Sequence, residues 1–463
     1  MTTRYVGEGG NDGSSGLSWA LRKLTLNGVE DTPVVAGDTV YVGPGVYREM
    51  LTTHVSGTSG NYISYIGDVT GINTDGVGGI VRITGSDNDT SAARAQCIIE
   101  SEAGQDYRLF QGFRFDTAST LLLKMNGNNA DHKQFIDCVF ILSGLTSEIL
   151  VGSADPAEII FKRCLLLGGK KYGVAIDMID TASTGAATDS LVENCVFIGQ
   201  MEGIRCDYNE FPIKNCTFIG CSRAIKHYGS TGNPVTVTNC HFFSCDSALV
   251  GWDTTGDIVE NYNNFWSCYT PRSYTATGAN STTTAFLPQT PILYNGVIMG
   301  AWWFPMLSQW DTTRALAGSS MSTDDIFGMT RPVTDSKKSW GAIQFTDTER
   351  ETTTVYDTSA ASIKMADAGR HQIWVPVTNT STTISVRVYR EADYAGTNPQ
   401  LVIKQPGQAD DTTTDAAAVS QWNLLTTTLT PSADTDYVVA ELVSNNTATS
   451  GNYDVFFDSL VVS

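Results

Sequence analysis

The side chains of this chain that could do chemistry lie in six short segments in which apolar and polar residues alternate. Aligned by this alternation, the segments are Leu123–Asn126, Ile149–Gly152, Val174–Asp177, Ile204–Asp207, Ile225–Tyr228 and Leu249–Trp252. The first and third residues of each segment are mostly apolar and are predicted to face a core, and the second and fourth to face outward. One outward column then reads Asn126, Gly152, Asp177, Asp207, Tyr228, Trp252, and its neighbour reads Lys124, Leu150, Ala175, Arg205, Lys226, Val250.

This alignment stacks Asp177 on Asp207, about 4.8 Å apart in adjacent strands. Two carboxylates this close share a proton, bind a cation or diverge into solvent. A retaining glycosidase holds its general acid and its nucleophile about 5–5.5 Å apart, so the two acids are a candidate catalytic pair. The alternative, which we favour at this point, is that both lie on a solvated face of an acidic protein.

Aromatic residues lie in the same outward column as the acids. Tyr228 and Trp252 are predicted to form a platform on which sugar rings stack, and Asn126 and Lys124 complete the predicted glycan-binding set. Exposed aromatic residues also mark subunit interfaces, and the sequence does not separate these two roles.

The histidines of this region are predicted to differ in orientation. His227 is the third residue of its segment and should be a core residue, whereas His241 should face outward. The sequence contains no Ser-His-Asp arrangement, phosphate-binding loop or His-Glu-x-x-His motif.

A repeated phrase of six residues fixes the strands that must carry these columns. Its clear copies occupy residues 135–140, 161–166, 192–197, 213–218 and 237–242, with weaker copies at 110–115 and 259–264. Repeats at intervals of 21 to 31 residues indicate one supersecondary unit stacked on copies of itself. Each clear copy has a Cys flanked by apolar residues that should point inward. A preceding Asn or Asp should bend the chain. Arg163 takes this bend position in one copy, so its coil should bend less regularly.

Composition and cysteine usage exclude several classes of protein. The 463 residues carry a formal charge of −20, which argues against nucleic acid as a partner. No apolar run approaches the roughly 20 residues that span a bilayer, and no secretion signal is visible at the start. Five of the ten cysteines share one repeated, apolar-flanked position, so we predict a stack of reduced core cysteines rather than disulfides or zinc ligands.

The segment 36–49, Ala-Gly-Asp-Thr-Val-Tyr-Val-Gly-Pro-Gly-Val-Tyr-Arg-Glu, resembles the first coil of right-handed parallel β-helices of the pectate-lyase-like superfamily. The column of Asn residues resembles the asparagine ladder of the same superfamily, and Ser339–Ile343 resembles its terminal segments. The resemblance implies an all-β protein with an N-terminal cap at 1–30 and a right-handed parallel β-helix with its closing cap at 31–345. The cap is predicted to contain a short helix, Leu17 to Leu26, with Trp19, Leu21 and Leu24 on or near one face.

Residues 346–463 have a different character, with alternating strands separated by loops rich in Thr, Ser, Asn and Asp. This length and pattern suit a β-sandwich of the jelly-roll type. The final strand resembles those of carbohydrate-binding and virion jelly rolls.

The resemblance also implies a chemical role for two basic residues. In the polysaccharide lyases of this superfamily, a basic residue beside a calcium-carboxylate cluster abstracts a proton next to the carboxylate of an acidic sugar. Arg205 and Lys226 would take this role here, although they also fit an ordinary surface ion-pair ladder. The candidate Ca²⁺ ligands are Asp177, Asp180, Asp207 and Glu210, which form no clear cluster, so no cofactor and no metal site are predicted.

Two functions remain open at this point, besides a third interpretation as a non-enzymatic glycan-binding surface protein. The first is a phage virion surface protein, a capsid decoration or a tail spike, that meets glycans. It would be made in the host cytoplasm and would assemble with other virion proteins or as a homotrimer. The cysteines predicted to be reduced and the absence of a leader favour it. The alternative is a secreted polysaccharide lyase or glycoside hydrolase with a C-terminal carbohydrate-binding module. A possible polysaccharide ligand is common to both, and neither inserts into a membrane.

Overall fold

A computed structural model describes most of the chain. The described residues are 1–283 except 33, 89–90, 93–95, 101–105, 127–131, 143–148, 154–157, 169–172, 181–188, 208–210, 230–233 and 253–255; then 287–288, 292–294, 297–299, 305–306, 323–324 and 326; and 348–462 except 352–361, 366–369, 378–379, 406–409, 417, 432–436 and 446–453. The chain divides into two compact units. The first comprises Met1–Ala285, Ala315–Asp335 and Trp340–Gln344, and the second comprises Phe286–Arg314, Ser336–Ser339 and Phe345–Ser463.

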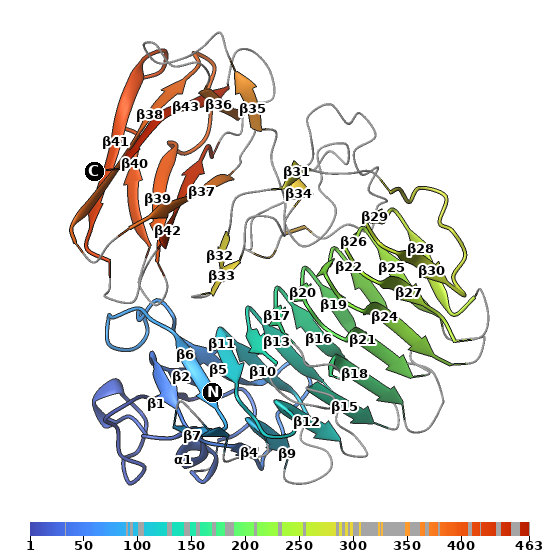
Figure 1. Cartoon of the computed structure of the whole chain (residues 1–463). Coiled ribbons are helices and arrows are strands. Elements are labelled where there is room, and N and C mark those ends of the chain that lie inside the picture. Colours follow the sequence, from blue (N-terminus) through green and yellow to red (C-terminus); the bar gives the residue numbers. More distant parts are fainter. Residues whose placement is uncertain are drawn as a thin grey trace. The chain divides into compact units, whose positions relative to one another are not determined.

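The first unit is a parallel β-helix built from three sheets, here called sheets A, B and C, each of which takes one strand from each coil (Figure 1). Sheet A contains β1 (Thr3–Val6), β2 (Thr39–Val42), β5 (Ile63–Gly67), β10 (Arg108–Gln111), β13 (Lys133–Ile136), β16 (Ile159–Lys162), β19 (Leu191–Glu193), β22 (Pro212–Lys214), β25 (Val235–Thr238) and β28 (Ile258–Asn261).

Sheets B and C follow sheet A in each coil. Sheet B contains β3 (Gly45–Tyr47), β6 (Val81–Thr84), β11 (Phe113–Asp116), β14 (Val139–Ile141), β17 (Leu165–Leu167), β20 (Val196–Ile198), β23 (Thr217–Ile219), β26 (His241–Phe243) and β29 (Asn264–Trp266). Sheet C contains β4 (Leu51–Thr53), β9 (Ile98–Glu100), β12 (Leu123–Asn126), β15 (Ile149–Ser153), β18 (Val174–Asp180), β21 (Glu202–Asp207), β24 (Arg223–Tyr228), β27 (Ser247–Val250) and β30 (Thr270–Ser273).

The repeated phrase forms the bend between sheets A and B, as predicted. Asn194, Asn215 and Asn239 have φ values of 55°, 53° and 56°, which lie in the left-handed region that Asn tolerates. The expected irregularity at Arg163 is wrong, because its φ is 53°. Its guanidinium stabilises this conformation from outside the bend: Nε donates to Oδ1 of Asp137 at 2.6 Å.

The core of the helix is formed by stacked columns of identical or similar side chains. Phe110, Phe135 and Phe161 stack with ring centroids 5.4 and 5.1 Å apart. Cys138, Cys164, Cys195, Cys216 and Cys240 are all fully buried and free, as predicted.

The N-terminal cap contains less helix than the sequence predicted. The structure has a 3₁₀ helix η1 (Trp19–Leu21) and a short α1 (Leu26–Glu30). Lys23 is instead bridged to Val6 of β1, so the backbone between the two helices is extended. Leu26 and Val29 of α1 are fully buried in the core. The predicted closing segment Ser339–Ile343 lies outside the described residues.

The second unit is an antiparallel β-sandwich with its own core, as predicted. One sheet contains β35 (Thr348–Glu351), β36 (Ser362–Met365), β43 (Val455–Val462), β38 (Thr382–Arg390) and β41 (Trp422–Leu429); the other contains β37 (Arg370–Pro376), β42 (Tyr437–Val443), β39 (Gln400–Lys404) and β40 (Asp411–Thr414). Buried and partly exposed residues alternate strictly along β38, so one face of this sheet packs into the core. Smaller antiparallel pairs are β31–β34 (Leu287–Pro288, Pro305–Met306), β32–β33 (Ile292–Tyr294, Val297–Met299) and, in the first unit, β7–β8 (Ser86–Asn88, Ser91–Ala92). Among the described residues, no helix is long and apolar enough to span a bilayer.

Candidate functional site

Most of sheet C pairs in the predicted register. Between β21 and β24, Arg205 pairs with Lys226 and Asp207 pairs with Tyr228. Between β24 and β27, Lys226 pairs with Val250. The strands therefore bring the basic residues and the aromatic residues of these coils to one outer face, as the alternation indicated.

The predicted stacking of Asp177 on Asp207 is wrong. Asp177 pairs with Arg205, whereas Asp207 pairs with Ile179. The strand β18 is seven residues long, and a pattern of period two fits equally well after a shift of two residues. The actual register places Met178 between Val151 and Cys206. Consequently the two carboxylates lie in different columns, and the paired-acid mechanism loses its basis.

Asp177 forms a buried ion pair with Arg205. Its carboxylate is about 1% exposed, and Nε of Arg205 donates to Oδ1 at 2.7 Å while Nη2 donates to Oδ2. This two-point arrangement is the strong form of the arginine–carboxylate interaction. Asp177 is thus occupied by its neighbour and holds Arg205 in a fixed orientation on the outer face.

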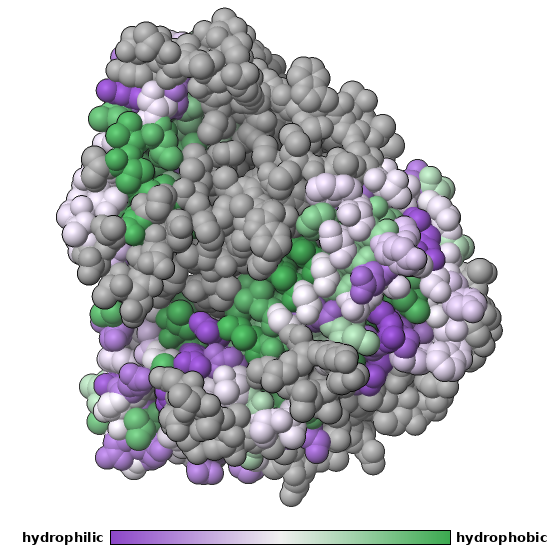
Figure 2. Space-filling model, in the orientation of Figure 1, coloured by the Kyte–Doolittle hydropathy of each residue, from purple (hydrophilic) through white to green (hydrophobic). Residues whose placement is uncertain are grey.

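Glu202 is a member of this site that the sequence pattern missed. Its side chain is about 5% exposed and accepts a hydrogen bond from Nη1 of Arg223. Nζ of Lys226 lies 3.6 Å from Oε1, and Nη1 of Arg205 lies 4.0 Å from Oε2. Among the described side chains of this cluster, two carboxylates are therefore surrounded by three cations, a net charge of +1 (3 − 2) on a chain with a charge of −20. Figure 2 shows this charged cluster as a strongly hydrophilic area over β18, β21 and β24.

The alternating pattern does not predict Glu202 as an outward residue, because the two residues after it are both buried. Gly203 and Ile204 are both buried, so the residue before them returns to the outer face. The sequence feature that could have located Glu202 is a column of small residues, each directly before a large inward residue of sheet C: Ala175, Gly203, Ala224 and Ala248. A Cβ on Gly203 would lie 2.6 Å from the carbonyl oxygen of Ala224, which explains the glycine.

Tyr228 and Trp252 form the predicted aromatic pair. Their ring centroids are 5.0 Å apart with an interplanar angle of 43°, and Trp252 is 55% exposed. Nζ of Lys226 lies 3.8 Å from the centroid of the Tyr228 ring and also contacts its hydroxyl. The backbone N–H of Trp252 donates to Oδ2 of Asp257 at 2.7 Å, and Asp257 is about 1% exposed. A buried carboxylate therefore fixes the backbone from which the exposed indole projects.

Burial lowers the pKa of Lys226, and the neighbouring cations Arg223 and Arg205 lower it further. The carboxylate of Glu202 acts in the opposite direction. The ammonium group is therefore easier to deprotonate than that of an exposed lysine.

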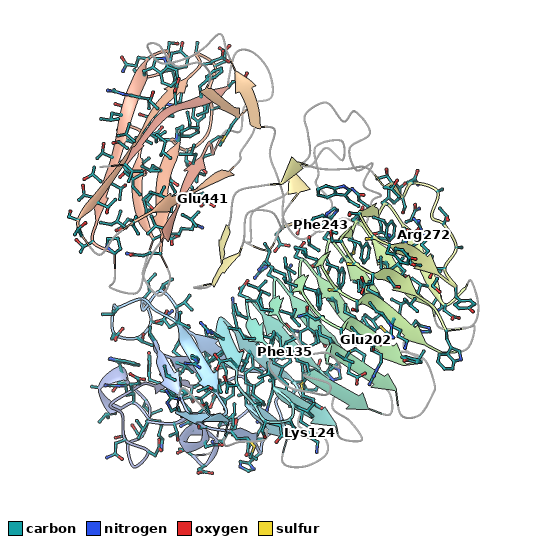
Figure 3. The ribbon with its side chains drawn as sticks, viewed as in Figure 1. Lys124, Phe135, Glu202, Phe243, Arg272 and Glu441 are labelled. Carbon is teal, nitrogen blue, oxygen red and sulfur yellow. The ribbon has the colours of Figure 1, made fainter. Side chains whose placement is uncertain are left out.

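Two predicted glycan-binding residues lie away from this cluster. Lys124 stands in the same column as Asp177, but the coil that carries Leu150 separates them, a distance of about 10 Å. Figure 3 shows Lys124 apart from Glu202. The backbone of Asn126 pairs with Gly152, while the side chains of Asn126 and Asp207 lie outside the described residues.

Both histidines of this region are buried, whereas only one of them was predicted to be. His227 is fully buried, as expected of a core residue. His241 was expected to face solvent, but it is 1% exposed, and burial lowers its pKa to about 3. The reason is that the outer face of sheet B is itself buried, as at Leu165 and Val196. Figure 2 shows hydrophobic residues over this part of sheet B.

Within the described part of the chain, no group of three or more His, Cys, Asp or Glu side chains could hold a metal ion. Of the candidate Ca²⁺ ligands, Asp177 is engaged by Arg205. Glu210 and the side chain of Asp180 lie outside the described residues.

No family model and no curated protein matches this chain. Among solved structures, XylC in complex with xylose is 13% identical with a TM-score of 0.46, over 57% of this chain and 65% of that one. A GH136 lacto-N-biosidase from Eubacterium ramulus is 10% identical with a TM-score of 0.42, over 57% and 56%. A family 16 carbohydrate-binding module is 11% identical with a TM-score of 0.21, over 26% and 86%. This chain thus spans less than two thirds of XylC, and its structural neighbours are carbohydrate-active β-helix proteins and carbohydrate-binding modules.

Proposed function

We propose that the outer face of sheet C binds carbohydrate. The observation that carries this proposal is the exposed Trp252, which is held by buried Asp257 and lies beside Tyr228 and Lys226. An indole and a phenol present flat, polarisable faces on which sugar rings stack, and the ammonium group beside them supplies a hydrogen-bond donor for a sugar oxygen. Because Tyr228 and Trp252 are adjacent, they form a continuous aromatic surface rather than a single exposed residue.

The charge of the cluster favours a sugar with an anionic substituent. Arg223 and Lys226 share the single charge of Glu202, while Asp177 neutralises Arg205. The cations are also the exposed members of this face: Arg205 and Arg223 are 26% and 37% exposed, whereas Asp177, Glu202 and Asp257 are 5% exposed or less. An excess of positive charge is therefore accessible from solvent beside the aromatic pair. Overall repulsion from a chain of charge −20 weakens non-specific binding of polyanions, so recognition would depend on this local excess.

Trp252→Ala tests the carbohydrate proposal. A glycan array identifies the ligand, and titration calorimetry then compares the variant with the unmodified chain. We expect at least a tenfold weaker affinity, about 1.4 kcal/mol, because the largest stacking surface is lost. Tyr269→Ala is the matched control. Tyr269 is 91% exposed and lies just before β30, at the opposite end of the sheet C strands from Trp252. If both variants lose glycan affinity equally, or if Trp252→Ala loses none, the aromatic pair is not the surface that binds the glycan.

A second candidate is a polysaccharide lyase in which Lys226 acts as the base. The lowered pKa of Lys226 and its contact with the Tyr228 hydroxyl favour this chemistry, since a base is most effective when its pKa approaches the working pH. In Lys226→Met, formation of the unsaturated product should be abolished while stacking on Trp252 still retains the glycan. Cleavage that persists in Lys226→Met would contradict this role.

The predicted place of the protein on a virion stays a prediction, as do its homotrimeric assembly and its location. If the glycan-binding face belongs to a capsid decoration or a tail spike, the protein should co-purify with particles as a regular oligomer. A monomer found only in culture supernatant would contradict that role and would leave the carbohydrate proposal unaffected.

A further inference from the structure

Three cysteines form a second column at the bend between sheets B and C in the last coils. The backbone N–H of Asp246 donates to the carbonyl of Cys221 at 3.0 Å, and that of Tyr269 donates to the carbonyl of Cys245 at 3.0 Å. Cys221, Cys245 and Cys268 are therefore in register, one coil apart. Each thiol lies near the carbonyl of a phenylalanine in the preceding coil, at 3.9, 3.7 and 3.5 Å respectively.

Cys268 differs from the other cysteines in its access to solvent. It is the one cysteine of the ten that is partly exposed, whereas Cys245 behind it is 1% exposed. The strand β30 that follows Cys268 is the last strand of sheet C. A small oxidant therefore reaches this column from its end, at Cys268.

The environment of Cys268 also favours the reactive thiolate. A hydrogen bond from the Cys245 thiol lowers the pKa of Cys268, against the opposing effect of burial. Against burial, hydrogen bonds from Cys245 and the backbone lower the pKa of Cys221 as well, but Cys221 is only about 1% exposed, so Cys268 is the thiol that combines a lowered pKa with access to solvent. In the other column, burial raises the pKa values of Cys138, Cys164, Cys195 and Cys216. Because the thiolate is the nucleophile, the inner column should be inert.

We propose that Cys268 is the peroxide-reactive thiol of this chain and that Cys245 converts the product into a disulfide. The Cys268 thiolate attacks one oxygen of hydrogen peroxide, the O–O bond breaks, and a sulfenic acid and water form after protonation. The Cys245 sulfur then attacks the sulfenic sulfur, an S–S bond replaces the S–O bond, and a second water leaves. Two thiols thus give two electrons and two protons to one peroxide.

The spacing of the coils permits this bond at the end of the helix. Adjacent strands lie about 4.7–4.9 Å apart, and disulfides join Cα atoms about 4.4–6.8 Å apart with Cβ atoms about 3.5–4.5 Å apart. The two Cβ atoms must therefore approach by at least about 0.2 Å, and by about 1 Å to reach the usual separation of about 3.8 Å. Among the described residues, the last coil has a neighbouring coil of sheet C on one side only, so it can shift, whereas an inner coil is fixed from both sides. The bond would link the segments that precede β27 and β30, at the opposite end of these strands from Trp252.

The test uses the full chain and hydrogen peroxide, followed by intact-mass measurement and peptide mapping. We expect the loss of two hydrogens, one disulfide between Cys245 and Cys268, and reversal by a dithiol reductant. In Cys245→Ser, the sulfenic acid on Cys268 should persist and react with a cyclic diketone probe. Cys221→Ser is the matched control and should form the disulfide as the unmodified chain does.

A second measurement needs no variant. In the native chain, a limiting amount of a small alkylating agent should label Cys268 at least tenfold faster than any other cysteine. A disulfide at another pair would overturn the proposal, as would peroxide oxidation of Cys268→Ser at an unchanged rate. Labelling of Cys268 no faster than its buried neighbours would overturn it as well.

Discussion

At the scale of single residues, the burial of His241 has a consequence that can be measured. Burial lowers its pKa to about 3 in the folded chain, against about 6.5 in an unfolded one. Below pH 6.5 the unfolded chain therefore binds a proton that the folded chain does not. The stabilising effect of the neutral imidazole is fully present above pH 6.5 and is lost as the pH falls toward 3.

His241→Gln tests this pH dependence. We expect the free energy of unfolding of the unmodified chain to fall by up to about 1.4 kcal/mol more per pH unit than that of the variant, between about pH 6 and pH 4. Denaturant unfolding at several pH values measures both slopes. Parallel curves would show that His241 is not desolvated in the folded state.

The residues of the site were predictable to different degrees. Tyr228 and Trp252 follow from alternation, because their strands contain the expected number of residues between bends. Glu202 does not, because it precedes two consecutive buried residues that break the alternation. The partner of Asp177 does not follow either, since a shift of two residues leaves every inward column apolar. An ion pair such as Asp177–Arg205 depends on this choice of register.

At the scale of elements, the bends were the most predictable feature of the fold. A column of Asn and Asp residues fits a left-handed backbone, which ordinary residues adopt at a cost of about 1–2 kcal/mol. The exception, Arg163, shows that the stacked neighbours impose the bend even where the residue does not favour it. The helix of the N-terminal cap was less predictable, because pairing of Lys23 with β1 competes with helix formation.

Substitutions at Asn194 separate the backbone contribution from that of the side chain. Asn194 has a φ of 55°, and its Nδ2 donates to the carbonyl oxygen of Asp324 at 2.9 Å. Both Asn194→Gly and Asn194→Ala lose this hydrogen bond, but only Ala retains a Cβ in the left-handed region. We therefore expect the Ala variant to be less stable than the Gly variant by about 1 kcal/mol in chemical denaturation. An Ala variant as stable as the Gly variant would mean that the bend is not strained.

At the scale of the whole molecule, the described residues form two separate hydrophobic cores. The core of the β-helix includes the Phe and Cys columns, and the core of the sandwich includes Val388, Leu401 and Phe457. The two cores share no residue, so each unit buries its own apolar surface. The fold class of both units was predictable from sequence because each core is built from a regular pattern, whereas the ligand depends on a few outward side chains that no pattern specifies.

Separate cores predict two thermal transitions in calorimetry, and Leu401→Ala assigns one of them. Leu401 is fully buried in the sandwich core, so its truncation should cost about 2–5 kcal/mol and lower one transition. The other transition should keep its midpoint, because additivity holds for distant sites without shared partners. The same unaffected transition should be the one that shifts when a glycan binds to sheet C. If Leu401→Ala lowers both transitions equally, the two cores unfold as one cooperative unit, and ligand binding at Trp252 would then stabilise the sandwich as well.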